Sequence, residues 1–122
     1  MGDVVVPLGG ATPTIPLTPE TRQAYLDLYK KAELAVQATA DGTILGSLND
    51  TKDAIGAVIS ADNDARLAQD DASFKAVQTQ IDAANDSMKK LAADIAGVAS
   101  KIKVFGDVAS GINTVLTLVS AV

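Results

Sequence analysis

The residues with the greatest chemical potential in this 122-residue chain are its clustered carboxylates. Asp62-Asn63-Asp64 begins like a calcium-binding loop, in which oxygen ligands alternate along the chain. That loop requires Gly at its sixth position and Glu at its twelfth, where this sequence has Leu67 and Ser73. The cluster is better explained by residues that cap a helix or form a turn.

Two further acid pairs have helical spacing, Asp50/Asp53 and Asp82/Asp86. Both are expected on solvated helix faces, away from any cleft that could hold a substrate. The chain contains no Cys and no His, which excludes thiol chemistry, Cys/His zinc sites and histidine acid–base catalysis. We therefore expect a non-enzymatic protein with no catalytic residues, no cofactor and no metal site.

The composition indicates one helical domain with close packing. Hydrophobic residues make up 48% of the chain, but aromatic residues only 3%, so small aliphatic side chains dominate the interior. The formal net charge is −5, and the basic residues are scattered without a stripe or interleaved aromatics. Nucleic-acid binding is therefore not expected.

The elements that position these residues are predicted by an apolar repeat from Phe74 to Val119. Apolar or small residues recur there at alternating steps of three and four, the spacing of a coiled-coil helix. An uninterrupted helix of this length measures roughly 70 Å and cannot bury its own stripe. The repeat therefore predicts an interaction stripe, which consists of Phe74, Val77, Ile81, Met88, Leu91, Ile95, Val98, Ile102, Phe105, Ile112, Leu116 and Val119.

The predicted fold is all-α: an elongated antiparallel helical hairpin or coiled-coil-like bundle with one very long C-terminal helix. Residues 1–18, rich in Pro and Gly, are predicted to form an extended strap or, equally, a disordered tail. The remaining chain, 19–122, is predicted to form the hairpin. Helix 1 is expected over about 19–60 and helix 2 over about 64–121.

Several capping signals compete for the position of the turn. Thr18-Pro19-Glu20 is a helix start, because Thr can cap free amides and Pro suits the first helical position. We place an interruption near 41–47 and the hairpin turn at about 60–64. In the alternative, the turn lies at 41–46 and helix continues through 60–64. Asp70-Asp71 with Ser73 is a third possible cap.

The last turns of the predicted long helix are apolar beyond the stripe. The extra residues form a predicted exposed apolar end, Val104, Val108, Val115, Leu118 and Val122. Roughly 24 Å of the long helix would have no partner within the hairpin. Another copy of the chain, the N-terminal strap or a membrane could cover it. Truncation at Lys103 is then expected to give smaller assemblies and better solubility.

Three glycines in the C-terminal half avoid the stripe, namely Gly97, Gly106 and Gly111. They are interpreted as positions where a second helix approaches closely or as a hinge for rearrangement. The alternative is that they are exposed glycines tolerated at a cost of about 1 kcal/mol each. We favour close approach.

The function that follows is an assembly or protein–protein interaction module, which oligomerises with itself or binds another helical protein through residues 74–119. The alternative is a membrane-active protein, similar in architecture to subunits of α-helical pore-forming assemblies, that uses residues 104–122. A standing transmembrane anchor is not expected, because the uncharged C-terminal run is too short. No signal peptide is recognisable, so a cytoplasmic location or export without a cleavable leader is expected.

Overall fold

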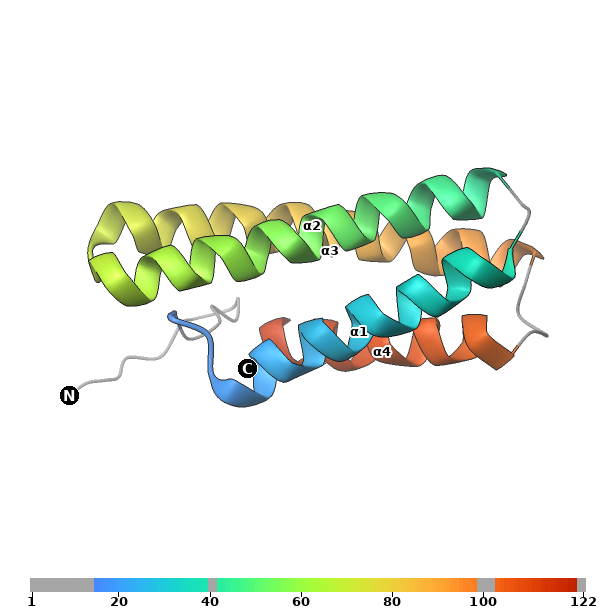
Figure 1. Cartoon of the computed structure of the whole chain (residues 1–122), viewed down its shortest axis with the longest axis horizontal. Helices are drawn as coiled ribbons and strands as arrows, with labels where there is room; N and C mark the ends of the chain where they lie inside the picture. The colour runs from blue at the N-terminus through green and yellow to red at the C-terminus, as the bar shows by residue number, and fades with distance from the viewer. Residues whose placement is uncertain (1–14, 40–41, 99–102, 121–122) are drawn as a thin grey trace.

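The computed structural model describes residues 15–39, 42–98 and 103–120, and these contain four α-helices (Figure 1). The helices are α1 (Pro19–Ala38), α2 (Gly42–Ala68), α3 (Asp71–Val98) and α4 (Lys103–Ser120). They run up and down in turn, and α4 returns beside α1, so the arrangement is like a four-helix bundle. The all-α prediction is confirmed.

The prediction of one very long C-terminal helix is wrong. α3 ends at Val98, and a separate helix, α4, begins at Lys103. Five apolar side chains of α4 are buried in the bundle, Phe105, Val108, Ile112, Val115 and Val119. A straight helix would hold these side chains in water, at a cost of roughly 1.5–3 kcal/mol each. Packing of α4 along α1 buries them instead.

The predicted hairpin turn at 60–64 is also wrong, because α2 continues through these residues to Ala68. The turn instead lies at Gln69 and Asp70. Gln69 adopts a left-handed conformation with φ of 51°, which is common where a helix ends. Asp70 then caps α3, since its carboxylate accepts hydrogen bonds from the Ser73 amide at 2.8 Å and the Ser73 hydroxyl at 2.7 Å.

The start of α1 follows the predicted capping chemistry. Thr18 is the N-cap, and its hydroxyl oxygen accepts a hydrogen bond from the Thr21 amide at 3.2 Å. Pro19 occupies the first turn, where a missing amide hydrogen costs nothing. Residues 1–14 of the predicted strap lie outside the described residues.

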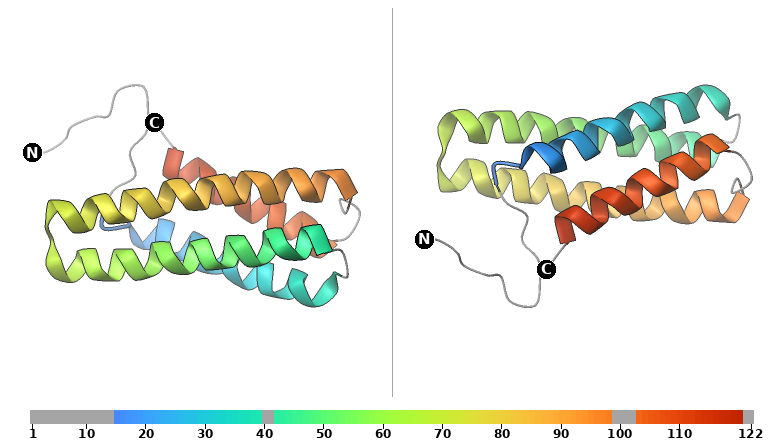
Figure 2. Two further views of the ribbon diagram at one scale, coloured as in Figure 1. Left: turned by 90° about the horizontal axis from the view of Figure 1, so that it is seen from above. Right: turned by 90° about the horizontal axis from the view of Figure 1, so that it is seen from below.

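The two halves of the bundle differ in length. α2 and α3 contain 27 and 28 residues, and α1 and α4 contain 20 and 18. The hairpin of α2 and α3 therefore extends past the other pair at one end (Figures 1 and 2). Leu17, just before α1, is buried there with 2% of its surface exposed. The residues before α1 thus help to close this end of the core.

Candidate functional site: the groove between α1 and α2

Most of the predicted interaction stripe forms the interior of the bundle. Its buried members are Val77, Ile81, Met88, Leu91, Ile95, Phe105, Ile112 and Val119. Phe74 and Leu116 are half-buried against the core. The side chain of Val98 and the whole of Ile102 lie outside the described residues. Because these side chains pack within one chain, a partner could reach them only if the bundle opened.

The predicted exposed apolar end is covered by the chain itself. Val108 and Val115 are completely buried, so the prediction is wrong for them. Val104 and Leu118 are half-buried, and Val122 lies outside the described residues. The reason is the reversal after α3, which places α4 along α1. In the predicted single long helix, no other helix of the chain lay beside these residues.

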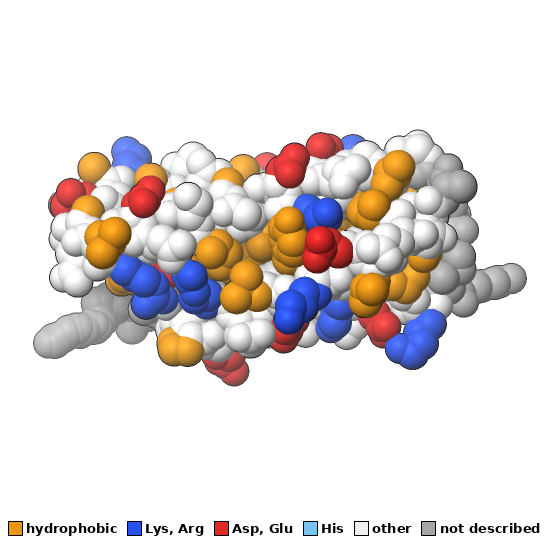
Figure 3. Space-filling view, in the orientation of Figure 1, with side chains coloured by type: hydrophobic (Ala, Val, Ile, Leu, Met, Phe, Trp, Pro, Cys, Tyr) orange, Lys and Arg blue, Asp and Glu red, His pale blue; other side chains and the backbone are white. Residues whose placement is uncertain are grey.

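A shallow apolar groove remains on the outer face where α1 and α2 meet. It is lined by Leu26 and Tyr29 of α1 and by Ile55, Gly56, Ile59, Ser60 and Asn63 of α2. Figure 3 shows hydrophobic side chains gathered along this face, with basic side chains beside them. We call this feature the α1–α2 groove. Apolar grooves between helices are a common docking surface for an amphipathic helix.

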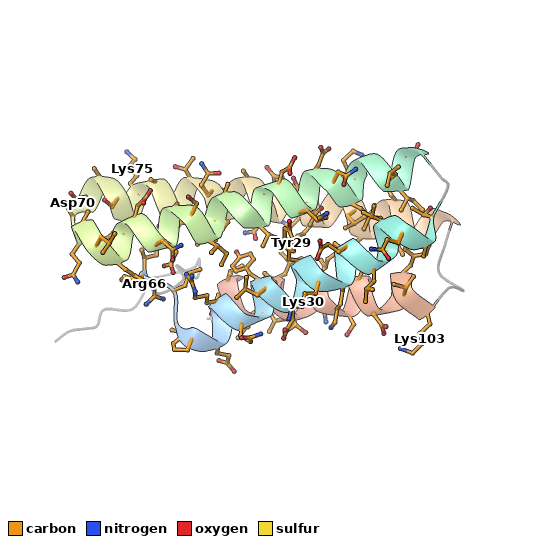
Figure 4. The ribbon with its side chains drawn as sticks, in the orientation of Figure 1. Tyr29, Lys30, Arg66, Asp70, Lys75 and Lys103 are labelled. Carbon is orange, nitrogen blue, oxygen red and sulfur yellow. The ribbon has the colours of Figure 1, made fainter. Side chains whose placement is uncertain are left out.

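Tyr29 is the aromatic side chain of the groove and lies between α1 and α2 (Figure 4). The ammonium nitrogen of Lys52 lies 5.3 Å from the centre of its ring, a cation–π contact. Next to it, Leu26 is 37% exposed, and it is one of three large hydrophobic side chains exposed among the described residues, with Leu34 and Leu67. Tyrosine is enriched among the residues that contribute most to protein–protein binding. The groove therefore combines an exposed leucine with an aromatic side chain already held in place.

A buried ion-pair cluster, which we call the Asp62 clasp, adjoins the groove at Asn63. The Asp62 carboxylate is completely buried and accepts hydrogen bonds from Arg22 at 2.7 Å, Arg66 at 2.8 Å and the Leu17 amide at 2.7 Å. The guanidinium of Arg66 also donates to the Leu17 carbonyl. The clasp therefore ties the chain before α1, α1 itself and α2 to one carboxylate.

The clasp corrects the sequence interpretation of Asp62-Asn63-Asp64 as capping residues. Asp62 lies within α2, and two arginines compensate its charge instead of a helix terminus. Asn63 accepts a hydrogen bond from Arg22 at 2.8 Å and also lines the groove. Sequence reasoning missed this role because Arg22 is separated from Asp62 by 40 residues.

A second polar cluster, at the opposite end of α2, contains Ser47, Lys90 and Asp94. The Ser47 hydroxyl donates to Asp94, and the Lys90 ammonium lies 3.0 Å from Ser47 and 3.2 Å from Asp94. The Ser47 hydrogen bond and Lys90 hold the pKa of Asp94 below its ordinary value. A Ser–Lys nucleophile requires a desolvated lysine, but Lys90 is 63% exposed and paired with Asp94. The cluster therefore joins α2 to α3 and has no catalytic geometry.

The bundle interior also contains polar atoms without hydrogen-bond partners among the described residues: the Tyr25 hydroxyl, Gln78 Oε1 and Asn85 Oδ1. Burial, and secondarily the charge of Asp82, raises the pKa of the Tyr25 phenol. An unpaired buried hydroxyl costs about 1–3 kcal/mol. No acid or base stands within hydrogen-bond reach of Tyr25 in the described chain, so it has no proton-transfer partner.

Another depression lies between α1 and α4. Its lining is mostly polar or charged, with Glu20, Gln23, Asp27, Lys31 and Thr114 around Ala24, Gly111 and Leu118. The surface that these residues expose to the depression is nevertheless mainly apolar, as it is in the α1–α2 groove. The depression contains no aromatic side chain. We therefore take the α1–α2 groove as the candidate site.

No protein-family model, curated protein or solved structure matches this chain. Within the described residues, no group of three or more acidic side chains is placed to hold a metal ion. The same residues include no helix that is long and apolar enough to cross a membrane. The function must therefore be inferred from the geometry of the bundle and its surface.

A weak signal for the groove was present in the sequence. Adjacent apolar residues occur as Tyr25-Leu26, Leu28-Tyr29 and Val58-Ile59. In each pair the first residue is buried, and the second is half-buried or exposed. Such pairs widen the apolar arc of a helix beyond the seam that one neighbour can cover. They indicate a second apolar surface, but not the helix that lies beside it.

Proposed function

We propose that this protein is a non-enzymatic interaction module that binds a helical protein partner in the α1–α2 groove. The observation that carries the proposal is the juxtaposition of Leu26 and Tyr29 with Ile59 on a surface outside the bundle core. The side chains of the heptad stripe already pack inside the bundle. We therefore expect the contact with a partner at the α1–α2 groove and no longer at residues 74–119. Self-association through the same face is the other form of the prediction.

The shape of the groove suits a helix. A Cβ atom added at Gly56 would meet no atom within 4 Å, so the groove is open above this glycine. Ile55 beneath it is completely buried and forms an apolar floor. Leucine or another aliphatic side chain of a partner would fill this space, and burial of one such side chain contributes about 1.5–3 kcal/mol.

A pair of glycine substitutions tests the groove directly. Gly56→Leu should fill the groove, whereas Gly46→Leu on the same helix places an equal side chain outside it. Neither added Cβ meets another atom within 4 Å, and both replacements raise helical propensity by roughly 0.8–1 kcal/mol. Both variants should therefore fold.

The measurement is affinity capture from a lysate of the source organism, with the three proteins immobilised in parallel. A partner of the groove should be retained by the wild type and by Gly46→Leu and reduced about tenfold by Gly56→Leu. Light scattering at rising concentration examines self-association with the same variants. Equal capture by all three proteins, together with equal masses, would contradict the proposal.

A further inference from the structure

We propose that the partner is an amphipathic helix with an acidic side chain at one end, and that Arg22 and Arg66 receive its carboxylate at the clasp end of the groove. This inference rests on the proposed function of the α1–α2 groove. It adds the chemistry and the orientation of the occupant.

The charge balance of the Asp62 clasp is the first observation. Two guanidinium groups share a single carboxylate, and among the described residues Asp62 is the one acid in ion-pair contact with either arginine. Within the described residues, the clasp thus has one positive charge in excess of its acid. Each arginine makes one further hydrogen bond, and both acceptors are neutral oxygens, those of the Asn63 amide and the Leu17 carbonyl.

Access to this charge is the second observation. Asp62 is completely buried, but the side chains of Arg22 and Arg66 are 28% and 42% exposed. The guanidinium groups therefore face Asp62 on one side and solvent on the other. Arginine can bind two oxygens at once in a fixed planar geometry, so a second carboxylate from outside would complete the pairing.

The position of the clasp relative to the groove is the third observation. Arg22 bonds to Asn63, and Asn63 lines the groove together with Leu26 and Ile59. From Asn63 back to Lys52, which lies over Tyr29, α2 rises about 16 Å, or three helical turns. Figure 4 shows Arg66 at one end of this strip, with Tyr29 and Lys30 farther along it.

The length of the groove indicates which helix would fit it. A helix that presents apolar side chains at positions i, i+4 and i+7 spans about 10 Å, which fits the apolar part of the groove. One more turn brings its next side chain beside the arginines. A carboxylate is favoured there over a neutral or basic side chain, and this preference fixes which way the helix runs.

Defined peptides test the inference on the full chain. Two helical probes each carry leucines at i, i+4 and i+7, with one glutamate a turn before or a turn after them. Two matched probes carry glutamine instead. One of the glutamate probes should bind about three- to fivefold more tightly than its glutamine counterpart at low salt.

Two protein variants assign that preference to the clasp. Arg66→Gln leaves Arg22 paired with Asp62, so the preference for glutamate should disappear. Lys75→Gln removes an exposed charge on α3 and should leave the preference intact. If circular dichroism shows that Arg66→Gln is unfolded, the salt dependence of the wild-type protein provides the test. The ratio of its affinities for the glutamate and glutamine probes must fall toward one at 0.5 M salt.

The outcomes separate the two proposals. Equal binding of glutamate and glutamine probes, with both blocked by Gly56→Leu, would overturn the carboxylate inference and leave the groove as a docking site. Failure of all four probes to bind at millimolar concentration would overturn the inference together with the proposed helical occupant. A dimer of the protein that Gly56→Leu dissociates would assign the groove to a second copy and overturn the acidic-helix inference alone.

Discussion

The α2–α3 hairpin and the α1–α4 pair are held together by different means. The hairpin joins consecutive helices across a tight turn, where Gln69 ends one helix and Asp70 caps the next. The α1–α4 pair joins opposite ends of the chain and has no comparable local signal. Local chemistry therefore marks the turn of the hairpin, whereas α1 and α4 pack through buried apolar side chains. Four experiments sharpen this contrast, from the largest expected effect to the smallest.

Removal of α4 should cause the largest loss. Deletion of residues 103–122 strips the five buried side chains of α4 from the core, a burial worth roughly 8–15 kcal/mol as an upper bound. A domain is stable by only about 5–15 kcal/mol, so the truncated chain should not unfold cooperatively and should aggregate. Urea titration and light scattering measure both properties.

This expectation reverses the one drawn from the sequence, in which truncation at Lys103 improves solubility. A matched control is Ile112→Ser in the full chain against Asn113→Ser, since Ile112 is buried and Asn113 is exposed. A soluble truncated chain with an unchanged unfolding midpoint would show that α4 is not part of the core.

Asp62→Ala should have the next largest effect. The substitution leaves Arg22 and Arg66 without their counter-ion and the Leu17 amide without an acceptor. Both arginines are partly exposed and remain solvated, so the main cost is the buried Leu17 amide that loses its acceptor, about 1–3 kcal/mol. The free energy of unfolding, measured with urea, should fall by that amount. A fall no larger than that of Asp64→Ala, an exposed neighbour, would show that the clasp contributes little.

Glycine substitutions in α4 test how closely α1 and α4 approach. The close approach predicted for three glycines holds for Gly111, where an added Cβ would lie 3.1 Å from Leu28 Cδ1. It is wrong for Gly97 and Gly106, where the Cβ would meet nothing within 4 Å. Gly106→Ala should raise the free energy of unfolding by up to about 1 kcal/mol. Gly111→Ala should gain less or lose stability, because Leu28 must move.

The two alanine substitutions are best compared by urea unfolding on the same day and in the same buffer. An equal gain from both would mean that α1 and α4 are farther apart than Leu28 and Gly111 indicate.

The smallest effect concerns pH. The pKa of Asp70 is lowered by hydrogen bonds from the Ser73 amide and hydroxyl, and that of Asp94 by Ser47 and Lys90. A carboxyl whose pKa is lower in the folded state stabilises the fold above its unfolded value, 3.8 for both groups. This contribution is lost as the pH falls through the lower folded values. The unfolding midpoint in urea should therefore decrease gradually below about pH 5.

Asp70→Asn and Asp94→Asn should each flatten part of that pH dependence. Asp94→Asn weakens the link between α2 and α3, whereas Asp70→Asn changes only the cap of α3. If neither variant changes the slope between pH 5 and pH 2.5, other carboxylates account for it.

The sequence by itself determined that the fold is all-α, where α1 begins, and which face of α3 is apolar. Thr18-Pro19 specified the start of α1, and the three–four spacing identified most of the buried side chains of α3 and α4, but not Val108 and Val115. These features are local, because they depend on capping bonds and on the 3.6-residue period.

Only the tertiary structure decided what covers each apolar face. The heptad phase continues across residues 99–102, so periodicity could not reveal that α4 leaves the axis of α3 and packs on α1. The same holds for Asp62, whose partner Arg22 is 40 residues away. A repeat predicts that one face of a helix is buried. Which helix packs on that face depends on the total surface removed from water when all the helices pack together.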